Sequence, residues 1–292
     1  MLTLKRLKMM IELDKIYNED CLQGMKRILD GSVDMILCDP PFGITDCKFD
    51  KRLPFEPMWE QFKRVTKHNA AIVLFSKMPF GAELIMSNRK MFRYEWIWEK
   101  NLGTGFLNAR KMPLVAHENI LVFYRALPTY NPQFRQGEPY KRKRRRVSFS
   151  QNYHAFNDKP CEYEYECDGR RFPLDIISYK QPFAGGAGDK SHPTQKPTDL
   201  LEYLIKTYTN EGESVLDATI GSGSTAVACI NTGRHFIGFE TEKKFYDIAN
   251  KRISKAYEEQ GLFKQGMFAE GNQAVIENDG ERMGGQLSAV VG

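Results

Sequence analysis

The sequence lacks the features of a membrane or secreted protein. No apolar run approaches the length that spans a bilayer, and the leucines near the N-terminus alternate with lysine and arginine instead of leading into a signal peptide. The six cysteines are scattered and none forms a Cys-x-x-Cys pair, which disfavours structural zinc and a disulfide framework. These absences argue against a membrane partner and predict a cytoplasmic chain with free thiols.

The excess of positive over negative charge is small over the whole chain, but basic residues are concentrated in one segment. The 292 residues carry 42 Lys and Arg against 37 Asp and Glu, a formal net charge of +5. Six basic residues nevertheless follow one another, with aromatic residues nearby on both sides. A basic run alone is typical of a solvated loop, whereas one with aromatic neighbours favours a nucleic-acid surface. The predicted DNA-binding residues are Lys141, Arg142, Lys143, Arg144, Arg145 and Arg146.

Short apolar runs alternate with helical patterns on both sides of the middle of the chain, which predicts an α/β fold with a mostly parallel sheet covered on both faces. Residues 126–190 lack clean periodicity and are interpreted as an insertion, and the pattern fades after Gly261. Strands are predicted over 34–38, 70–75, 94–98, 119–124, 214–218 and 235–239, and helices over 58–67, 197–208, 225–232 and 245–260.

The most informative motif, Asp-Pro-Pro-Phe, follows the apolar strand predicted over 34–38. Pro40 and Pro41 have fixed φ and no N–H group, so the turn is stiff and its carbonyls are free to accept hydrogen bonds. Asp39 adds a carboxylate acceptor and Phe42 a flat apolar face. Acceptors beside a stacking surface suit a planar ring that bears an exocyclic amine, such as adenine or cytosine.

A second motif, at residues 214–226, has the pattern of a strand, a glycine turn and a helix start. Gly221 and Gly223 permit close approach of the backbone to a ligand, and the spacing fits the nucleotide-binding pattern G-x-G-x-x-G/A. Glu240 ends the next predicted strand, where an acid suits ribose hydroxyls. The loop has no P-loop lysine, which disfavours ATP chemistry. A Rossmann dinucleotide site fits this motif alone but leaves the Asp-Pro-Pro-Phe turn unexplained.

Together the two motifs resemble those of the amino-methylating DNA methyltransferases, which use S-adenosylmethionine and combine (Asp/Asn/Ser)-Pro-Pro-(Tyr/Phe/Trp) with a glycine loop. The order here, with the catalytic turn first, resembles the circularly permuted β class of bacterial and phage enzymes. Segments at 17–22 and 192–197 also match, so the resemblance extends over roughly residues 11–255. It implies a Rossmann-like, seven-stranded methyltransferase sheet divided into a catalytic half (1–125), a target-recognition insertion (126–190), a cofactor-binding half (191–260) and a tail (261–292).

The resemblance also implies roles for particular residues. Asp39, Pro40, Pro41 and Phe42 would act on a base flipped out of double-stranded DNA, with no metal required, and an aspartate at position 39 favours adenine N6 over cytosine N4. A homodimer and a cognate restriction endonuclease are allowed as further partners. The expected contacts to S-adenosylmethionine come from Asp20, Cys21, Asp39, Lys196, Asp217, Thr219, Gly221, Gly223, Ser224 and Glu240.

Several alternatives remain open from the sequence. The enzyme alternatives are cytosine-N4, RNA and protein-glutamine methylation, and a catalytically silent DNA-binding subunit is a fourth. Asp20 equally fits a helix cap, and Lys196-Pro197 equally fits a helix start. His117-Glu118 is interpreted as structural, and at least one of Trp96 and Trp98 as a core residue.

Overall fold

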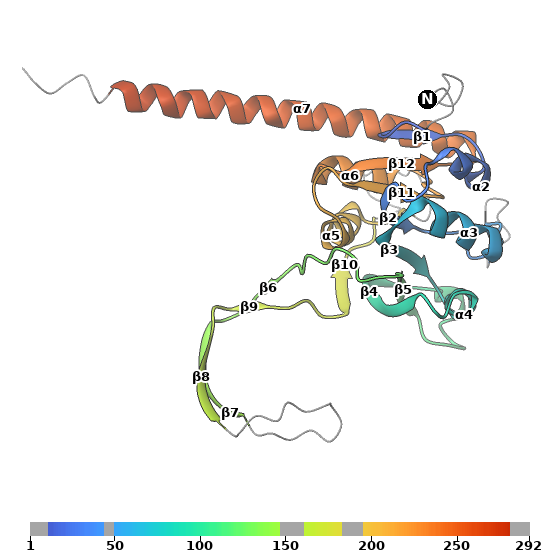
Figure 1. Ribbon diagram of the computed structural model, residues 1–292, viewed down its shortest axis with the longest axis horizontal. Helices are drawn as coiled ribbons and strands as arrows, with labels where there is room; N and C mark the ends of the chain where they lie inside the picture. Colours follow the sequence, from blue (N-terminus) through green and yellow to red (C-terminus); the bar gives the residue numbers. More distant parts are fainter. Residues whose placement is uncertain (1–10, 44–49, 147–160, 183–194, 281–292) are drawn as a thin grey trace, which may run out of the picture.

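The computed structural model describes residues 11–43, 50–146, 161–182 and 195–280. Its centre is an eight-stranded sheet of order β1-β12-β11-β2-β3-β5-β4-β10 (Figure 1). All neighbours pair in parallel except β5, which is antiparallel to both β3 and β4. The strands are β1 (Lys15–Tyr17), β2 (Val33–Cys38), β3 (Thr66–Ser76), β4 (Phe92–Thr104), β5 (Val115–Phe123), β10 (Ile176–Tyr179), β11 (Ser214–Asp217) and β12 (His235–Phe239).

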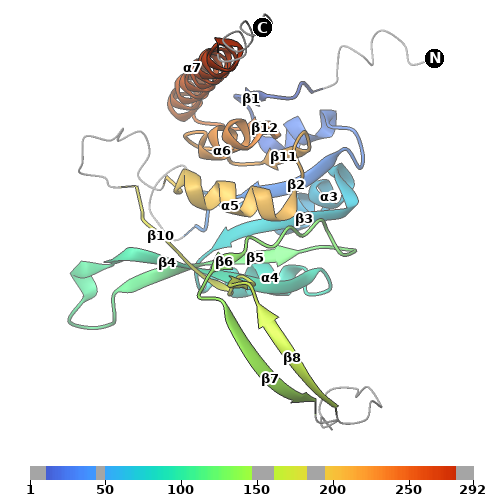
Figure 2. The ribbon, with the colours of Figure 1, turned by 90° about the vertical axis from the view of Figure 1, so that its left-hand side faces the viewer.

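Helices cover both faces of this sheet (Figures 1 and 2), so alternate residues of β2 enter two separate cores. Met35 and Leu37 pack with α5, α6 and the start of α7, whereas Ile36 and Cys38 pack with α2, α3 and α4. Burial on both faces explains why the central strands are continuous apolar runs. The helices are α2 (Cys21–Gly24), α3 (Phe55–Val65), α4 (Phe80–Ser87), α5 (Thr198–Tyr208), α6 (Ser224–Thr232) and α7 (Lys243–Gly280), with 3-10 turns η1 (Met25–Arg27) and η2 (Phe106–Asn108).

The predicted α/β sheet is confirmed, but it has an eighth strand and several different boundaries. The additional strand, β10, comes from the region interpreted as irregular and pairs with β4 at the sheet edge. The helix predicted over 58–67 ends at Val65, and β3 begins at the buried Thr66, which is followed by three exposed polar residues without a strand-like pattern. The helix predicted over 245–260 runs from Lys243 to Gly280, since no proline interrupts it after residue 260.

Between β5 and β10, the described residues leave the body and form two antiparallel strand pairs, connected to it by irregular segments (Figure 2). A short pair, β6 (Arg135–Gln136) with β9 (Arg170–Arg171), lies nearer the body, and β7 (Tyr140–Arg146) pairs antiparallel with β8 (Cys161–Cys167) beyond it. We call the β7–β8 pair the ribbon. Trp96 and Trp98 are both buried, as expected for core residues. Within the described ranges, no helix is long and apolar enough to cross a membrane.

Candidate active site

A cavity of about 1640 Å³ opens where the parallel strands β1, β12, β11 and β2 reach their carboxyl ends. Ligands of open α/β sheets bind at this edge. The volume exceeds the roughly 300–1,000 Å³ of a typical small-molecule pocket, so the cavity has room for a nucleoside-sized cofactor and a second planar group. Both motifs that the sequence singled out lie along its wall.

The glycine loop after β11 is held by two carboxylates. Asp217 is buried, and its carboxylate accepts hydrogen bonds from the Thr225 hydroxyl (2.6 Å) and the Thr219 amide (3.1 Å). Burial raises the pKa of Asp217 to about 7, against the effect of these two donors. Glu240, at the end of β12, accepts the Gly221 amide at 3.0 Å, and burial raises its pKa as well. The hydrogen bonds to Asp217 and Glu240 therefore fix the conformation of the loop in the absence of a ligand.

The structure separates the two glycines that the sequence assigned to close ligand approach. Gly221 (φ 54°) lines the cavity. Gly223 (φ 82°) precedes α6 and is not among the lining residues. A Cβ atom on Gly223 would lie 3.0 Å from the Cβ of Ala249 and 3.1 Å from its Cα. The lack of a side chain at Gly223 therefore permits the close approach of α7 to the loop.

Replacing Gly223 with alanine is expected to lower the free energy of unfolding by more than the same change at Gly212. Both glycines have a left-handed backbone, which costs other residues roughly 1–2 kcal/mol. Only Gly223 has Ala249 against it, whereas a Cβ at Gly212 meets nothing within 4 Å. Urea denaturation of the two variants measures the difference. Equal losses would show that α7 yields to the added methyl group.

The segment after β1 brings two predicted cofactor residues to the cavity. Asp20 accepts the Gln23 amide at 3.1 Å and so caps α2, which confirms the helix-cap interpretation. Asp20 and Cys21 both line the cavity. Burial raises the pKa of Cys21 to about 12, so its thiol is neutral at physiological pH and is not a nucleophile.

The Asp-Pro-Pro-Phe turn presents one occupied and one unoccupied carboxylate oxygen. Oδ2 of Asp39 accepts the Lys196 ammonium at 2.6 Å, whereas the buried Oδ1 has no hydrogen-bond partner among the described residues. The Thr219 hydroxyl donates to the Asp39 carbonyl at 3.0 Å and so joins the glycine loop to the turn. Phe42 stacks on Phe80, with ring centroids 5.2 Å apart. The turn therefore places a buried acceptor and an aromatic ring in the lining of the same cavity.

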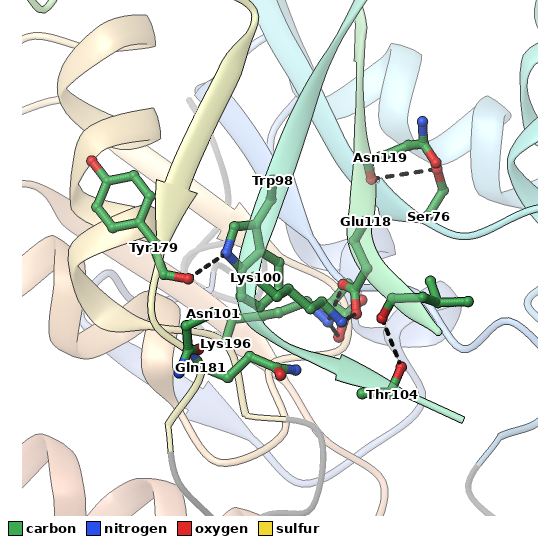
Figure 3. A network of polar contacts seen from close by, with 12 residues as sticks. Ser76, Trp98, Lys100, Asn101, Thr104, Glu118, Asn119, Tyr179, Gln181 and Lys196 are labelled. Carbon is green, nitrogen blue, oxygen red and sulfur yellow. Dashed lines mark hydrogen bonds and ion pairs between the residues drawn. The ribbon is translucent and has the colours of Figure 1, made fainter. Parts of the chain in front are cut away.

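Four charged side chains meet at the inner wall of the cavity: Asp39, Lys196, Glu118 and Lys100. Figure 3 shows three of them converging, Lys100 from β4, Glu118 from β5 and Lys196 from the segment before α5. Glu118 pairs with both Lys100 and Lys196, the latter at 3.3 Å. The two lysine side chains are only 6% and 10% exposed. We call these residues the charged quartet.

The charges of the quartet control one another's protonation. Burial raises the pKa of Asp39; the Lys196 ammonium opposes this rise, whereas the Glu118 carboxylate adds to it. Although burial opposes ionisation of Glu118, the two lysines lower its pKa below the usual range. The pKa of Lys196 is raised by both carboxylates despite its burial. Lys196 therefore remains protonated, and its charge favours the acceptor form of Asp39.

The cavity gathers most of the residues predicted from the sequence, and two that were missed. Glu118, interpreted as structural, belongs to the quartet, and Lys100 was not predicted at all. A charged residue inside a strand, two positions before the apolar run that starts at Ile120, is the signal that could have identified Glu118. The basic run lies on β7, outside the cavity lining. The predicted residues that line the cavity are Asp20, Cys21, Asp39, Pro40, Pro41, Phe42, Lys196, Asp217, Thr219, Gly221, Ser224 and Glu240.

Known proteins resemble the chain over most of its length. The chain is 31% identical to the Type II methyltransferase M.BglII of Bacillus subtilis over 273 residues, which cover 86% of this chain and 72% of that protein. It is 27% identical to the Type II methyltransferase M1.MboII of Moraxella bovis, with 82% and 96% covered.

Solved structures share the fold. The crystal structure of the M1.HpyAVI–SAM complex matches with a TM-score of 0.56 and 24% identity, over 82% of this chain and 98% of that one. The PvuII cytosine-N4-specific DNA methyltransferase matches with a TM-score of 0.59 and 14% identity, over 85% and 93%. The model of the N6/N4 DNA methylase family matches residues 33–251, well over half of the chain. The chain therefore belongs to this family, the amino-methyltransferases of DNA.

Proposed function

We propose that the protein transfers a methyl group from S-adenosylmethionine to adenine N6 of a base flipped out of double-stranded DNA. The observation that carries this proposal is the buried Oδ1 of Asp39, which has no partner among the described residues and lies in a cavity large enough for a cofactor and a base. A buried acceptor without a donor is costly, and an exocyclic amine would satisfy it.

The other half of the cavity fits the donor. Gly221 and Asp217 suit the methionine end, Glu240 the ribose hydroxyls, and Asp20 the adenine, and all of them line the same cavity. Bound there, S-adenosylmethionine supplies an electrophilic methyl group on a sulfonium. Lys196 was predicted as a cofactor contact, and its contact with Asp39 makes it a positioning residue for the turn as well.

The chain would contribute positioning and electrostatics. The N6 lone pair is delocalised into the adenine ring, and a hydrogen bond to Oδ1 of Asp39 draws the amine into a geometry where the pair can attack. The positive charge that develops on nitrogen is stabilised by the carboxylate, which also lies where it can accept the released proton. Phe42, held by Phe80, offers the base a stacking face. The base must leave the duplex to reach the cavity.

We propose adenine rather than cytosine as the target base, because an aspartate at the first position of the turn resembles the adenine-N6 enzymes of the family. Cytosine-N4 transfer is the second candidate, since cytosine also presents an exocyclic amine and one structural match is named a cytosine-N4 enzyme. A cognate restriction endonuclease fits the Type II names of the relatives, and a homodimer would help one chain reach both DNA strands.

Incubation with labelled S-adenosylmethionine and unmethylated genomic DNA, followed by digestion to nucleosides, tests the proposal. The label is expected in N6-methyladenine. Label in N4-methylcytosine would be consistent with the mechanism but would overturn the assignment of adenine as the target base. Cofactor binding by calorimetry with no label in DNA would overturn the DNA substrate and leave RNA, protein or a silent binding subunit.

A further inference from the structure

The ribbon has two chemically different faces. β7 and β8 pair in antiparallel register from Tyr140 opposite Cys167 to Arg146 opposite Cys161. Successive residues of a strand alternate between the two faces of a ribbon, so residues directly opposite each other share a face. The six basic residues therefore divide into two groups of three, odd-numbered and even-numbered, on opposite faces.

The odd-numbered group is matched by acids. Lys141, Lys143 and Arg145 stand opposite Glu166, Glu164 and Glu162. Two of these pairs are ion pairs between exposed side chains, Lys141–Glu166 at 2.5 Å and Lys143–Glu164 at 3.5 Å. Each exposed pair contributes little stability, but it cancels charge on that face. We call this side the ladder face.

The even-numbered group has no acid opposite it. Arg142 stands opposite Tyr165, Arg144 opposite Tyr163, and Arg146 opposite Cys161. Tyr140 begins the same face, and the Arg171 guanidinium lies 5.1 Å from the centre of its ring, which brings further positive charge to the ribbon's base. We call this side the arginine face. The excess positive charge of the ribbon's paired residues is thus on one side only.

We infer that the ribbon binds double-stranded DNA through its arginine face, with the ladder face turned away. This rests on the proposed function, and it restricts the predicted DNA contact from six basic residues to three. Two further observations support it. The ribbon stands clear of the body (Figures 1 and 2), and the major groove of B-DNA admits a two-stranded β-ribbon. Arginine and tyrosine together offer phosphate contacts and flat surfaces, whereas the ladder face offers DNA no net attraction.

Two triple variants with the same change in net charge test the inference. R142Q/R144Q/R146Q removes the three positive charges of the arginine face, and K141Q/K143Q/R145Q removes the three positive charges of the ladder face. The measured quantity is the slope of log Kobs against log salt for a mixed-sequence duplex. The slope is expected to fall by about 0.9 for each phosphate that the protein no longer neutralises, hence by roughly 2–3 in the arginine-face variant, and to stay nearly unchanged in the ladder variant.

A sixfold variant controls for the glutamates that the ladder triple uncovers. It adds E162Q/E164Q/E166Q to the ladder triple, restores the net charge, and is expected to bind DNA like the parent protein. Equal slope losses in the two triples, a larger loss in the ladder triple, or no loss in either would overturn the inference. Labelled methyl transfer by the parent protein is measured independently of the salt slopes. A negative result for the arginine face is therefore distinguishable from a negative result for the proposed function.

Discussion

Methyl transfer is expected to fall by a factor of about 10²–10⁴ when Asp39 is replaced by alanine, because the variant loses both the acceptor for the amine and the charge that stabilises the developing cation. Binding of S-adenosylmethionine, measured by calorimetry, is expected to be largely retained, because the glycine loop keeps its own supports from Asp217 and Glu240. Single-turnover transfer to DNA measures the loss directly.

A matched control comes from Asp30, an exposed carboxylate before β2 that pairs with Arg64 at 2.5 Å and does not line the cavity. Asp30→Ala removes the same group elsewhere and is expected to retain full activity. Full activity in the Asp39 variant would remove this residue from the mechanism, whatever base is methylated.

Replacing Lys196 with methionine is expected to destabilise the protein by about 3–5 kcal/mol, the usual cost of removing one partner from a buried ion pair. Of the two quartet lysines, Lys100 alone would then remain near the carboxylates of Asp39 and Glu118. The Lys196 ammonium lowers the pKa of Asp39, so its loss raises that pKa further and moves the acid limb of the activity profile to higher pH.

The sign of the stability effect follows from the same shift. A carboxyl group whose pKa is higher in the folded than in the unfolded state binds protons on folding, so lowering the pH through that pKa favours the fold. The destabilisation of the Lys196→Met variant is therefore expected to shrink at acidic pH. Urea denaturation at acidic and at neutral pH measures it, and a loss independent of pH would contradict the electrostatic explanation.

Glu118→Gln is expected to move the acid limb of the activity–pH profile in the direction opposite to that of Lys196→Met. The Glu118 carboxylate raises the pKa of Asp39, so removing that charge is expected to shift the acid limb to lower pH, with the side chain's shape retained. Glu202→Gln, on α5, removes a carboxylate that contacts Asn231 and Lys206 and does not line the cavity, and it is expected to leave the profile in place. Shifts of the same sign in the Lys196 and Glu118 variants would refute the proposed role of the quartet.

The motifs of the site could be predicted from the sequence, whereas the charged residues that surround the Asp-Pro-Pro-Phe turn could not. Asp39, Gly221 and Glu240 each follow a buried strand, and the local pattern of strand, turn and acid carries its own meaning. Lys100 and Glu118 carry no such pattern. They meet because Trp98 pairs with Glu118 across β4 and β5, and because the chain returns at Lys196 after the whole insertion. Contacts of this kind depend on register, which hydrophobic periodicity does not specify.

The same limit explains the ribbon and the sheet edge. No described residue of β7 or β8 belongs to either hydrophobic core. β7 is almost entirely basic and has no apolar alternation, whereas β8 alternates glutamate with tyrosine and cysteine, a strand signal that the sequence analysis missed. β10 has only four residues, of which two are exposed. The buried strands β2, β11 and β12 were found within one residue of their ends because their burial on two faces leaves a continuous apolar run.

The pairing of β2 with β11 has a consequence for biosynthesis. These neighbours lie 180 residues apart in the chain, since Met35 pairs with Val215. During translation β2 emerges long before β11, and one edge of the central sheet waits without its hydrogen-bonding partner until the glycine-loop half has been made. Non-local pairing of this kind slows folding and exposes a strand edge to other chains. The order of the motifs along the chain therefore leaves this edge of the nascent catalytic half open to aggregation until β11 has been made.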